Sequence, residues 1–143
     1  MSKEARKGAT FEQDVADYMA ARLGKKDIER RVKNGANDRG DITGLMMRGK
    51  RVVVECKNHA KMALSEWLDE AEVERGNDSA EFGIVVHKRK GRGAKRFGEN
   101  YVTMTLDTYL AMTAGSRWLL MFDEEERRNS RLMARERGID EWG

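Results

Sequence analysis

The stretch DRGDITGLMMRGKRVVVECKNH, residues 38–59, decides how this chain folds. It contains two β-rich apolar runs, residues 42–47 and 52–56, separated by the short polar segment 48–51 with its glycine. Two such runs joined by a short turn are typical of an antiparallel hairpin. The sequence therefore predicts a hairpin that folds the start of the first run back toward the end of the second.

Three ionisable side chains meet at one end of this predicted hairpin. Asp41 begins the first run, while Glu55 and Lys57 end the second. Because side chains alternate along a strand, Glu55 and Lys57 point to one face and Cys56 to the other. Carboxylates suit Mg²⁺, and a lysine ammonium can hold the attacking water and stabilise charge on a phosphate. A solvated ion pair on a strand face is the alternative interpretation, and Asp38 competes with Asp41 as the metal carboxylate.

Two motifs in the chain resemble a known group of nucleases. The pattern GD at residues 40–41, followed by ECK at residues 55–57, resembles the D…(D/E)xK core of restriction-endonuclease-like nucleases. The segment KGATFE at residues 7–12 resembles the first-helix motif of the archaeal Holliday junction resolvases and their phage relatives. The resemblance covers roughly residues 5–110. It departs from the pattern at Gly40, where many members carry proline.

This resemblance implies a set of site residues and a reaction. The implied catalytic residues are Glu12, Asp41, Glu55 and Lys57. The implied ligands for Mg²⁺, or for Mn²⁺ as its substitute, are Asp41, Glu55, Glu12 and the backbone carbonyl of Cys56. The implied activity is DNA cleavage that leaves 5′-phosphates, although the same fold also serves restriction, repair and replication nucleases. From the residues alone, Glu12 is equally a first-turn glutamate favoured by the helix dipole.

The hydrophobic patterns predict an α/β fold with the element order α-β-β-β-α-β-β-α. Helices are expected at residues 9–23, 64–76 and 108–114, with Thr10 and Asp107 as caps of the first and last. Further strands are expected at 28–32, 82–86 and 101–106, the last burying Val102, Met104 and Leu106. The run 82–86 is apolar throughout, as in a buried parallel strand after a helical crossover. With the resemblance, these elements imply a restriction-endonuclease-like mixed β-sheet flanked by helices.

The composition bounds the class of protein. A chain of 143 residues fits one domain, with a nuclease part at 1–115 and a C-terminal helical tail at 116–143. No apolar run approaches the ~20 residues of a membrane span, and the N-terminus lacks the apolar segment of a signal peptide. One cysteine excludes an internal disulfide and leads us to expect a cytoplasmic protein. One cysteine and two histidines argue against a structural zinc site.

The charge distribution points to DNA as the partner. Residues 1–60 hold 14 Lys and Arg against 9 Asp and Glu, so the basic excess accompanies the predicted site. Residues 87–96 form a predicted flexible loop rich in cations, suited to gripping phosphates without reading sequence. Solvated surface loops are the alternative for these cations. The predicted DNA-binding residues are Lys7, Arg31, Lys33, Arg39, His59, Lys61, Lys88, Arg89, Lys90, Arg92, Lys95 and Arg96.

The helical tail is the predicted dimerisation element. It begins with the apolar run 118–122 and then becomes strongly charged, so it gains little from packing within its own domain. A four-way DNA junction is resolved by two symmetric nicks, and one chain with one site supplies only one of them. We therefore expect a homodimer, the commonest oligomer, acting on a four-way junction. A partly disordered tail is an alternative, as are a flap or linear-end nuclease and a non-catalytic DNA-binding module.

Overall fold

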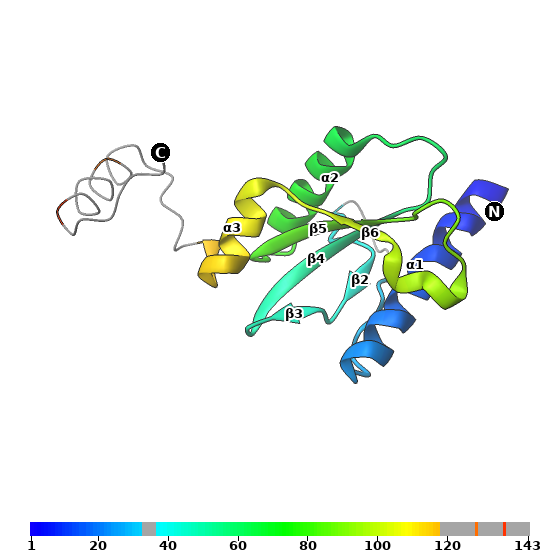
Figure 1. The fold of residues 1–143 in the computed structure, drawn as a ribbon, viewed down its shortest axis with the longest axis horizontal. Coiled ribbons are helices and arrows are strands. Elements are labelled where there is room, and N and C mark those ends of the chain that lie inside the picture. Colours follow the sequence, from blue (N-terminus) through cyan, green and yellow to red (C-terminus); the bar gives the residue numbers. More distant parts are fainter. Residues whose placement is uncertain (33–36, 118–127, 129–135, 137–143) are drawn as a thin grey trace.

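The computed structural model describes residues 1–32, 37–117, 128 and 136. Its helices are α1 (Lys3–Leu23), α2 (Leu64–Asn77) and α3 (Leu106–Ala114), with a 3₁₀ segment η1 (Ala94–Glu99) (Figure 1). Its strands are β1 (Glu29–Arg30), β2 (Ile42–Thr43), β3 (Met46–Met47), β4 (Lys50–Lys57), β5 (Phe82–His87) and β6 (Tyr101–Thr103). The predicted tail beyond residue 117 falls almost entirely outside the described residues. Among the described helices, none has the length and hydropathy needed to cross a bilayer.

The strands form one mixed sheet, as the sequence predicts. Its order is β1-β2-β4-β5-β6, and β3 also pairs with β4. Only the β4–β5 pair is parallel among the described pairs, from Val52 opposite Phe82 to Lys57 opposite His87. The connection between these two strands contains α2, because parallel neighbours require a crossover. The central strand β4 therefore carries its Glu55–Lys57 end beside the end of β5.

The predicted hairpin forms, but its first arm is broken into β2 and β3. Ile42 pairs with Val54 and Met46 with Arg51, so four residue steps on one arm oppose three on the other. The extra residue is a β-bulge at Gly44, whose φ of 91° favours glycine. The turn between β3 and β4 places Arg48 and Gly49 at φ 51° and 78°, as a two-residue hairpin turn of the I′ type requires.

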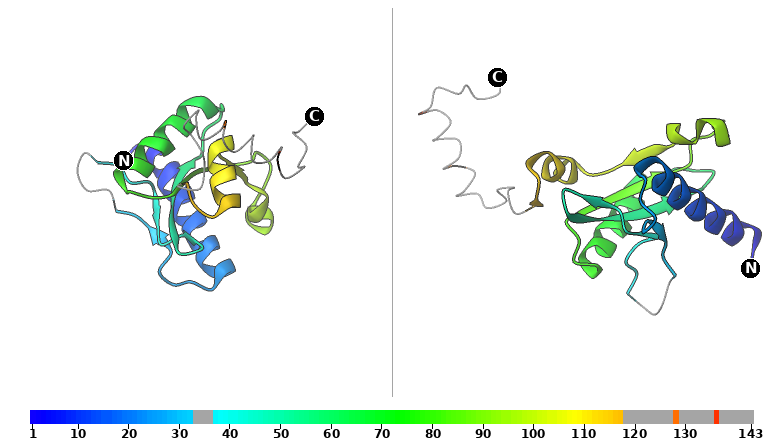
Figure 2. Two further views of the ribbon diagram at one scale, coloured as in Figure 1. Left: turned by 90° about the vertical axis from the view of Figure 1, so that its left-hand side faces the viewer. Right: turned by 90° about the horizontal axis from the view of Figure 1, so that it is seen from below.

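Each face of the sheet has its own apolar core, and the two helices α1 and α2 lie on opposite faces (Figure 2). Phe11, Val15 and Ala16 of α1 pack with Val52, Val54 and Cys56 of β4, with alternate residues of β5 and with Ala111 of α3. On the other face, Trp67 and Ala71 of α2 pack on Val85. Trp67 is buried, as predicted. The alternation along β4 therefore points Glu55 and Lys57 toward α2.

The helix starts differ from the predicted caps. Helix α1 begins at Lys3 because the Ser2 side chain caps it by accepting a hydrogen bond from the Ala5 backbone N–H, so Thr10 lies inside the helix. Its end at Gly24, in the left-handed conformation, is as predicted. Helix α3 begins at Leu106, capped by Thr105 rather than Asp107, because the Thr105 hydroxyl accepts from the Thr108 N–H.

The prediction for residues 101–106 is wrong in its length and in its buried face. Strand β6 ends at Thr103, and Leu106 opens α3. Val102 is 52% exposed and Leu106 is 72% exposed, so neither contributes a buried side chain. The alternation of Val102, Met104 and Leu106 spans a strand and a helix start, where the two-residue period no longer fixes a face.

Candidate active site

Asp41 is anchored to the central strand at the entrance to β2. Its backbone N–H donates to the Val54 carbonyl (2.8 Å), and its Oδ2 accepts from the Cys56 N–H (2.7 Å). The residue is 1% exposed. These two bonds place Asp41 beside Glu55 on the neighbouring antiparallel strand, which is the juxtaposition that the hairpin predicts.

Glu55 and Lys57 share one face of β4, and their charged groups are in contact. Lys57 Nζ lies 3.3 Å from Glu55 Oε1 and 2.6 Å from Glu70 Oε2, a carboxylate supplied by α2. Burial lowers the pKa of Lys57, but the hydrogen bond to Glu70 and the charge of Glu55 outweigh burial and leave that pKa raised. Lys57 is therefore an ammonium at neutral pH, able to donate hydrogen bonds and neutralise negative charge.

Glu12 lies on the other side of the sheet from this contact. It sits on α1, which packs on the Cys56 face of β4, and its Oε2 accepts from Arg30 Nε at 2.8 Å. The pairing with Arg30 occupies a carboxylate that the resemblance assigns to the metal. A role for Glu12 at the metal stays a prediction.

Cys56 is a core residue, as the sequence predicts, and its side chain is buried with the α1 cluster. Burial raises the pKa of its thiol far above the ordinary value, and the negative charge of Asp41 raises it further. A thiol held protonated in this way is not a nucleophile. The backbone N–H of Cys56 holds the Asp41 carboxylate, and a role for its backbone carbonyl at the metal stays a prediction.

Two further carboxylates reach the Glu55 side chain, and one of them was missed by sequence reasoning. One carboxylate oxygen each of Asp38, Glu55 and Glu74 lies within 4.8 Å of the others. Asp38, the alternative to Asp41 as the predicted metal carboxylate, belongs to this group. Glu74 has a signal in the sequence: Trp67, Ala71 and Glu74 follow helical spacing on the buried face of α2. A glutamate at this spacing lies on the buried face of the helix, so Glu74 is a buried acid.

The donor set fits a hard divalent cation. Asp41 and Glu55 supply carboxylate oxygens, which Mg²⁺ and Mn²⁺ prefer. Both residues are buried, Asp41 at the entrance to β2 and Glu55 near the end of β4. The Oε2 atom of Glu55 is buried with no hydrogen-bond partner among the described residues. A buried carboxylate oxygen in that state is costly unless a proton or a cation satisfies it.

The structure describes five of the six predicted DNA-binding residues before β5, and these five fall into two groups. Arg31 lies 3.7 Å from Asp78 through its Nη2, so its charge is engaged within the protein. Exposed side chains are found at Lys7, Arg39, His59 and Lys61. Lys33 lies outside the described residues.

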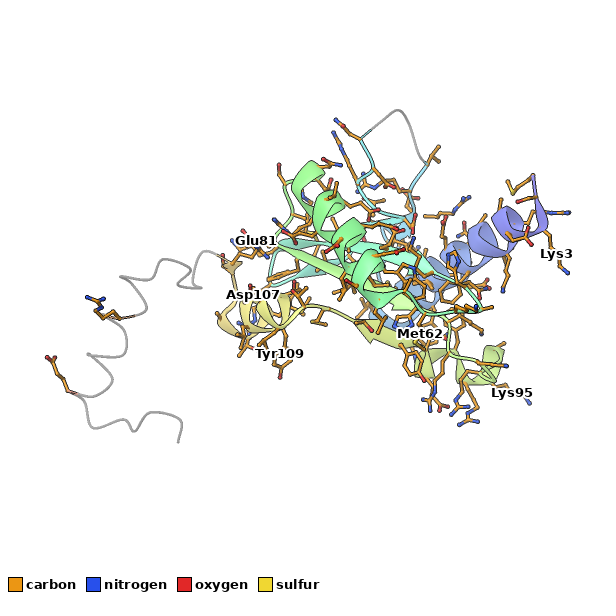
Figure 3. The ribbon with its side chains drawn as sticks, turned by 90° about the horizontal axis from the view of Figure 1, so that it is seen from above. Lys3, Met62, Glu81, Lys95, Asp107 and Tyr109 are labelled. Carbon is orange, nitrogen blue, oxygen red and sulfur yellow. The ribbon has the colours of Figure 1, made fainter. Side chains whose placement is uncertain are left out.

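The basic loop, residues 87–96, contains more secondary structure than the sequence predicts, and fewer of its cations are left unpaired for binding phosphates. His87 is the buried last residue of β5 rather than a loop residue, and η1 closes the loop. Arg92 and Arg96 both pair with Glu99, at 3.3 Å and 2.7 Å. Lys88 and Arg89 lie over the rings of Phe97 and Tyr101. Lys90 and Lys95 remain exposed, and Figure 3 shows Lys95 toward the end of the molecule that carries Lys3, away from Tyr109.

A groove of about 590 Å³ joins the first-helix motif to the basic loop. Lys7, Thr10 and Phe11 line it from α1, Asn58 lines it from the end of β4, and Lys88 and Phe97 line it from the loop and η1. Two of the predicted DNA-binding lysines, Lys7 and Lys88, therefore share one concavity next to the strand end. Asp14 and Asp17 also line it, so its charge is mixed.

One comparison with known proteins gives a match. The model of a family described as phage putative PDDEXK endonuclease matches residues 3–111. No curated protein and no solved structure matches the chain. The matched range covers every element described here except the end of α3.

Proposed function

Because the chain belongs to the phage PDDEXK endonuclease family, we propose that it is a divalent-metal-dependent DNA endonuclease whose reaction is carried by Asp41, Glu55 and Lys57. The observation that supports this most is the placement of Asp41 beside Glu55 on neighbouring strands, with the Lys57 ammonium 3.3 Å from Glu55. Two carboxylates and one cation on one face suit hydrolysis of a phosphodiester.

Each residue has a distinct task in this proposal. Asp41 and Glu55 would hold Mg²⁺, or Mn²⁺ in its place. Such a cation would supply Lewis acidity toward a phosphate oxygen and would lower the pKa of the water it binds. Lys57 donates hydrogen bonds that orient the attacking water and offset charge that develops on the phosphate. Glu70 fixes the Lys57 ammonium in place. As water adds to phosphorus and loses a proton, the bond to the 3′ oxygen breaks and that oxygen takes up a proton, leaving a 5′-phosphate and a 3′-hydroxyl.

Asp41→Asn and Glu55→Gln each test the proposal, because each removes a charge while keeping the shape of the side chain. We expect cleavage in Mg²⁺ to fall by at least about 100-fold, the upper end of the loss seen when an outer partner of a metal site is removed. DNA binding in a gel-shift assay should survive. Glu66→Gln, on the exposed first turn of α2, is the matched control and should cleave normally.

The same assay separates an enzyme from a binding module. Cleavage that disappears with a chelator supports the endonuclease. Full activity of either variant in Mg²⁺ would remove the assignment of Asp41 and Glu55. DNA binding without cleavage by the unaltered protein, in Mg²⁺ or Mn²⁺, would leave a non-catalytic DNA-binding module on the same fold.

For the substrate we propose a four-way DNA junction cut by a homodimer. Support comes from the KGATFE motif at residues 7–12, which resembles the junction resolvases, and from the need for two sites to make two nicks. Exposed apolar side chains on β6 and α3 offer surface for a second subunit: Val102, Leu106, Tyr109 and Leu110. The alternatives are a flap, linear-end or restriction-type nuclease.

Cleavage of a mobile four-way junction beside matched duplex, single-stranded and flap DNA tests the substrate, with the oligomeric state measured by light scattering. Paired nicks on opposing junction strands by a dimer support the proposal. A preference for flaps or linear ends, or an active monomer, contradicts it while leaving the endonuclease assignment intact.

A further inference from the structure

The groove between α1 and the basic loop has no task in the proposed reaction. Its volume of about 590 Å³ is that of a site for a small organic group, since such sites span ~300–1,000 Å³. One wall is a stripe of α1 side chains at helical spacing: Lys7, Phe11, Asp14 and Tyr18. Asn58, which also lines the groove, directly follows Lys57. The groove therefore opens at the same end of β4 as the proposed active site.

Aromatic packing fixes the distance between the two walls, because α1 and η1 lie side by side (Figure 1). The ring of Phe97, from η1, lies 6.0 Å from that of Phe11 and 5.2 Å from that of Tyr18. The Tyr18 hydroxyl accepts from Arg22 Nε at 3.0 Å. An added Cβ at Gly98 would clash with that hydroxyl, so a residue without a side chain lets η1 approach α1. The apolar part of the groove is thus built before any ligand arrives.

The polar part of the groove carries both signs of charge. The side chains of Lys7 and Asp14 form no hydrogen bond or ion pair within the described part of the chain, and they lie about 10 Å apart along the helix axis. The backbone of a DNA duplex presents phosphates alone, which Asp14 would repel. An unpaired nucleotide presents a phosphate and also a base, whose amino group can donate to a carboxylate, as cytosine N4 does. Unpaired bases also favour contact with aromatic side chains.

We propose that this groove holds one unpaired nucleotide of the DNA substrate. Its phosphate would lie at Lys7, its base against Phe97, and an amino group of the base would donate to Asp14. The inference rests on the proposed function, because it takes DNA as the substrate, and it adds the kind of DNA. The protein should prefer DNA with an unpaired nucleotide, at a bulge, a flap or the crossover of a branched substrate, over continuous duplex.

Fluorescence anisotropy in EDTA tests the groove, because it measures DNA binding without cleavage. The probes are two labelled duplexes that differ only at one bulged position, which holds a cytosine nucleotide in one and an abasic nucleotide in the other. Both carry the same phosphates, so the ratio of their dissociation constants reports contacts to the base. We expect the unaltered protein to bind the cytosine bulge at least about fivefold more tightly, the low end of one base–aromatic contact.

Two variants locate this preference in the groove. Asp14→Ala and Phe97→Leu should each bring the ratio toward one. Asp14 is exposed on a helix, where alanine is well tolerated, so this variant keeps the fold even if Phe97→Leu does not. Asp69→Ala, at an exposed position of α2, removes the same charge outside the groove and should keep the ratio of the unaltered protein.

The outcomes separate the groove from the proposed function. Equal affinity of the unaltered protein for the two bulges, or a ratio that survives Asp14→Ala, would overturn the groove proposal. If such a protein still cleaves DNA in a reaction that requires Asp41, the endonuclease assignment stands alone. A cytosine preference that depends on Asp14, in a protein that cleaves no DNA in Mg²⁺ or Mn²⁺, would support the groove and sink the endonuclease.

Discussion

His87 is a buried histidine whose environment opposes protonation. Its Nε2 lies 2.7 Å from the Thr103 hydroxyl, and its ring lies 5.4 Å from that of Trp67 and 5.1 Å from that of Tyr101. Its Nδ1 is buried with no hydrogen-bond partner among the described residues. Burial lowers the pKa of His87 below the ordinary 6.5. The residue that the sequence placed at the start of a basic loop is therefore a neutral core residue at pH 7.

This environment makes folding stability sensitive to acid. Below pH 6.5 the unfolded chain takes up a proton on residue 87 that the folded chain does not, so the free energy of unfolding falls as the pH drops from 6.5 toward the folded pKa. The slope for one proton is at most about 1.4 kcal/mol per pH unit. The measurement is the free energy of unfolding in urea at several pH values between 7 and 5. His87→Gln should make this free energy depend less on pH, whether or not it also changes stability at pH 7.

The second histidine provides the control. His59 is exposed, so His59→Gln tests whether loss of any histidine changes the slope. A His87→Gln variant with an unchanged slope between pH 7 and 5 would show that other groups carry the acid sensitivity.

Gly40 explains a departure from the nuclease motif. Its φ is 93°, and an added Cβ would lie 2.9 Å from Val53 Cγ1 and 3.0 Å from the Val54 carbonyl oxygen. Proline, which many members carry at this position, is locked near φ −65° and has no N–H to donate to Asp38. The chain therefore enters β2 by a route that only glycine allows, and this route brings Asp38 to Glu55 and Glu74.

At the scale of elements, the bulge at Gly44 sets the register of the hairpin. A one-residue slip moves every side chain of a strand to the other face, so the bulge decides whether Asp41 and Glu55 share a face. An added Cβ at Gly44 would clash with the Asp27 carbonyl oxygen. This backbone contact cannot be relieved by a side-chain rotation.

Gly44→Ala should therefore destabilise the protein more than Gly49→Ala does. Both residues have positive φ, at 91° and 78°, so both alanines bear the left-handed strain of about 1–2 kcal/mol. Nothing lies within 4 Å of a Cβ at Gly49, so the difference between the variants isolates the clash with Asp27. The measurement is the midpoint of urea unfolding. Equal midpoints for the two variants would mean that the backbone at the bulge shifts to remove the clash without loss of stability.

At the scale of the whole molecule, the exposed cations determine where a DNA backbone can lie. Glu99 engages Arg92 and Arg96, whereas Lys90 and Lys95 are exposed in the loop and have no ion pair among the described residues. In Figure 3, Lys3, Met62 and Lys95 lie toward one end of the molecule, and Asp107 and Tyr109 toward the other. Lys95, one of the predicted DNA-binding residues, therefore lies at the first of these ends.

Neutralising Lys90 and Lys95 together, as glutamines, should weaken DNA binding similarly for all sequences. Each phosphate contact contributes about 0.9 to the slope of log affinity against log salt, so the pair should lower that slope by about 1.8. Lys25→Gln with Lys26→Gln, beyond the other end of α1, removes the same charge and should leave the slope unchanged. If the slope equals that of the unaltered protein, Lys90 and Lys95 do not contact DNA phosphates and the loop is a solvated surface loop.

The sequence by itself determined the features that depend on neighbours along the chain. Alternation and turn residues predicted the hairpin and the common face of Glu55 and Lys57. Helical spacing predicted the buried Trp67, and a continuous apolar run predicted the buried parallel strand β5. These follow from periods of about 2.0 and 3.6 residues, which are local properties of the backbone. The D…ExK pattern likewise predicted the nuclease family.

Only the tertiary structure decided which charges meet across the chain. It paired Glu12 with Arg30 and Lys57 with Glu70, and it brought Glu74 to Glu55. It also paired the loop arginines with Glu99, which leaves fewer free cations than their sequence suggests. Local periodicity tells which face a charge occupies but not what lies opposite. The partner depends on how separate elements pack, and the short range of ion pairs makes the outcome sensitive to a few ångströms.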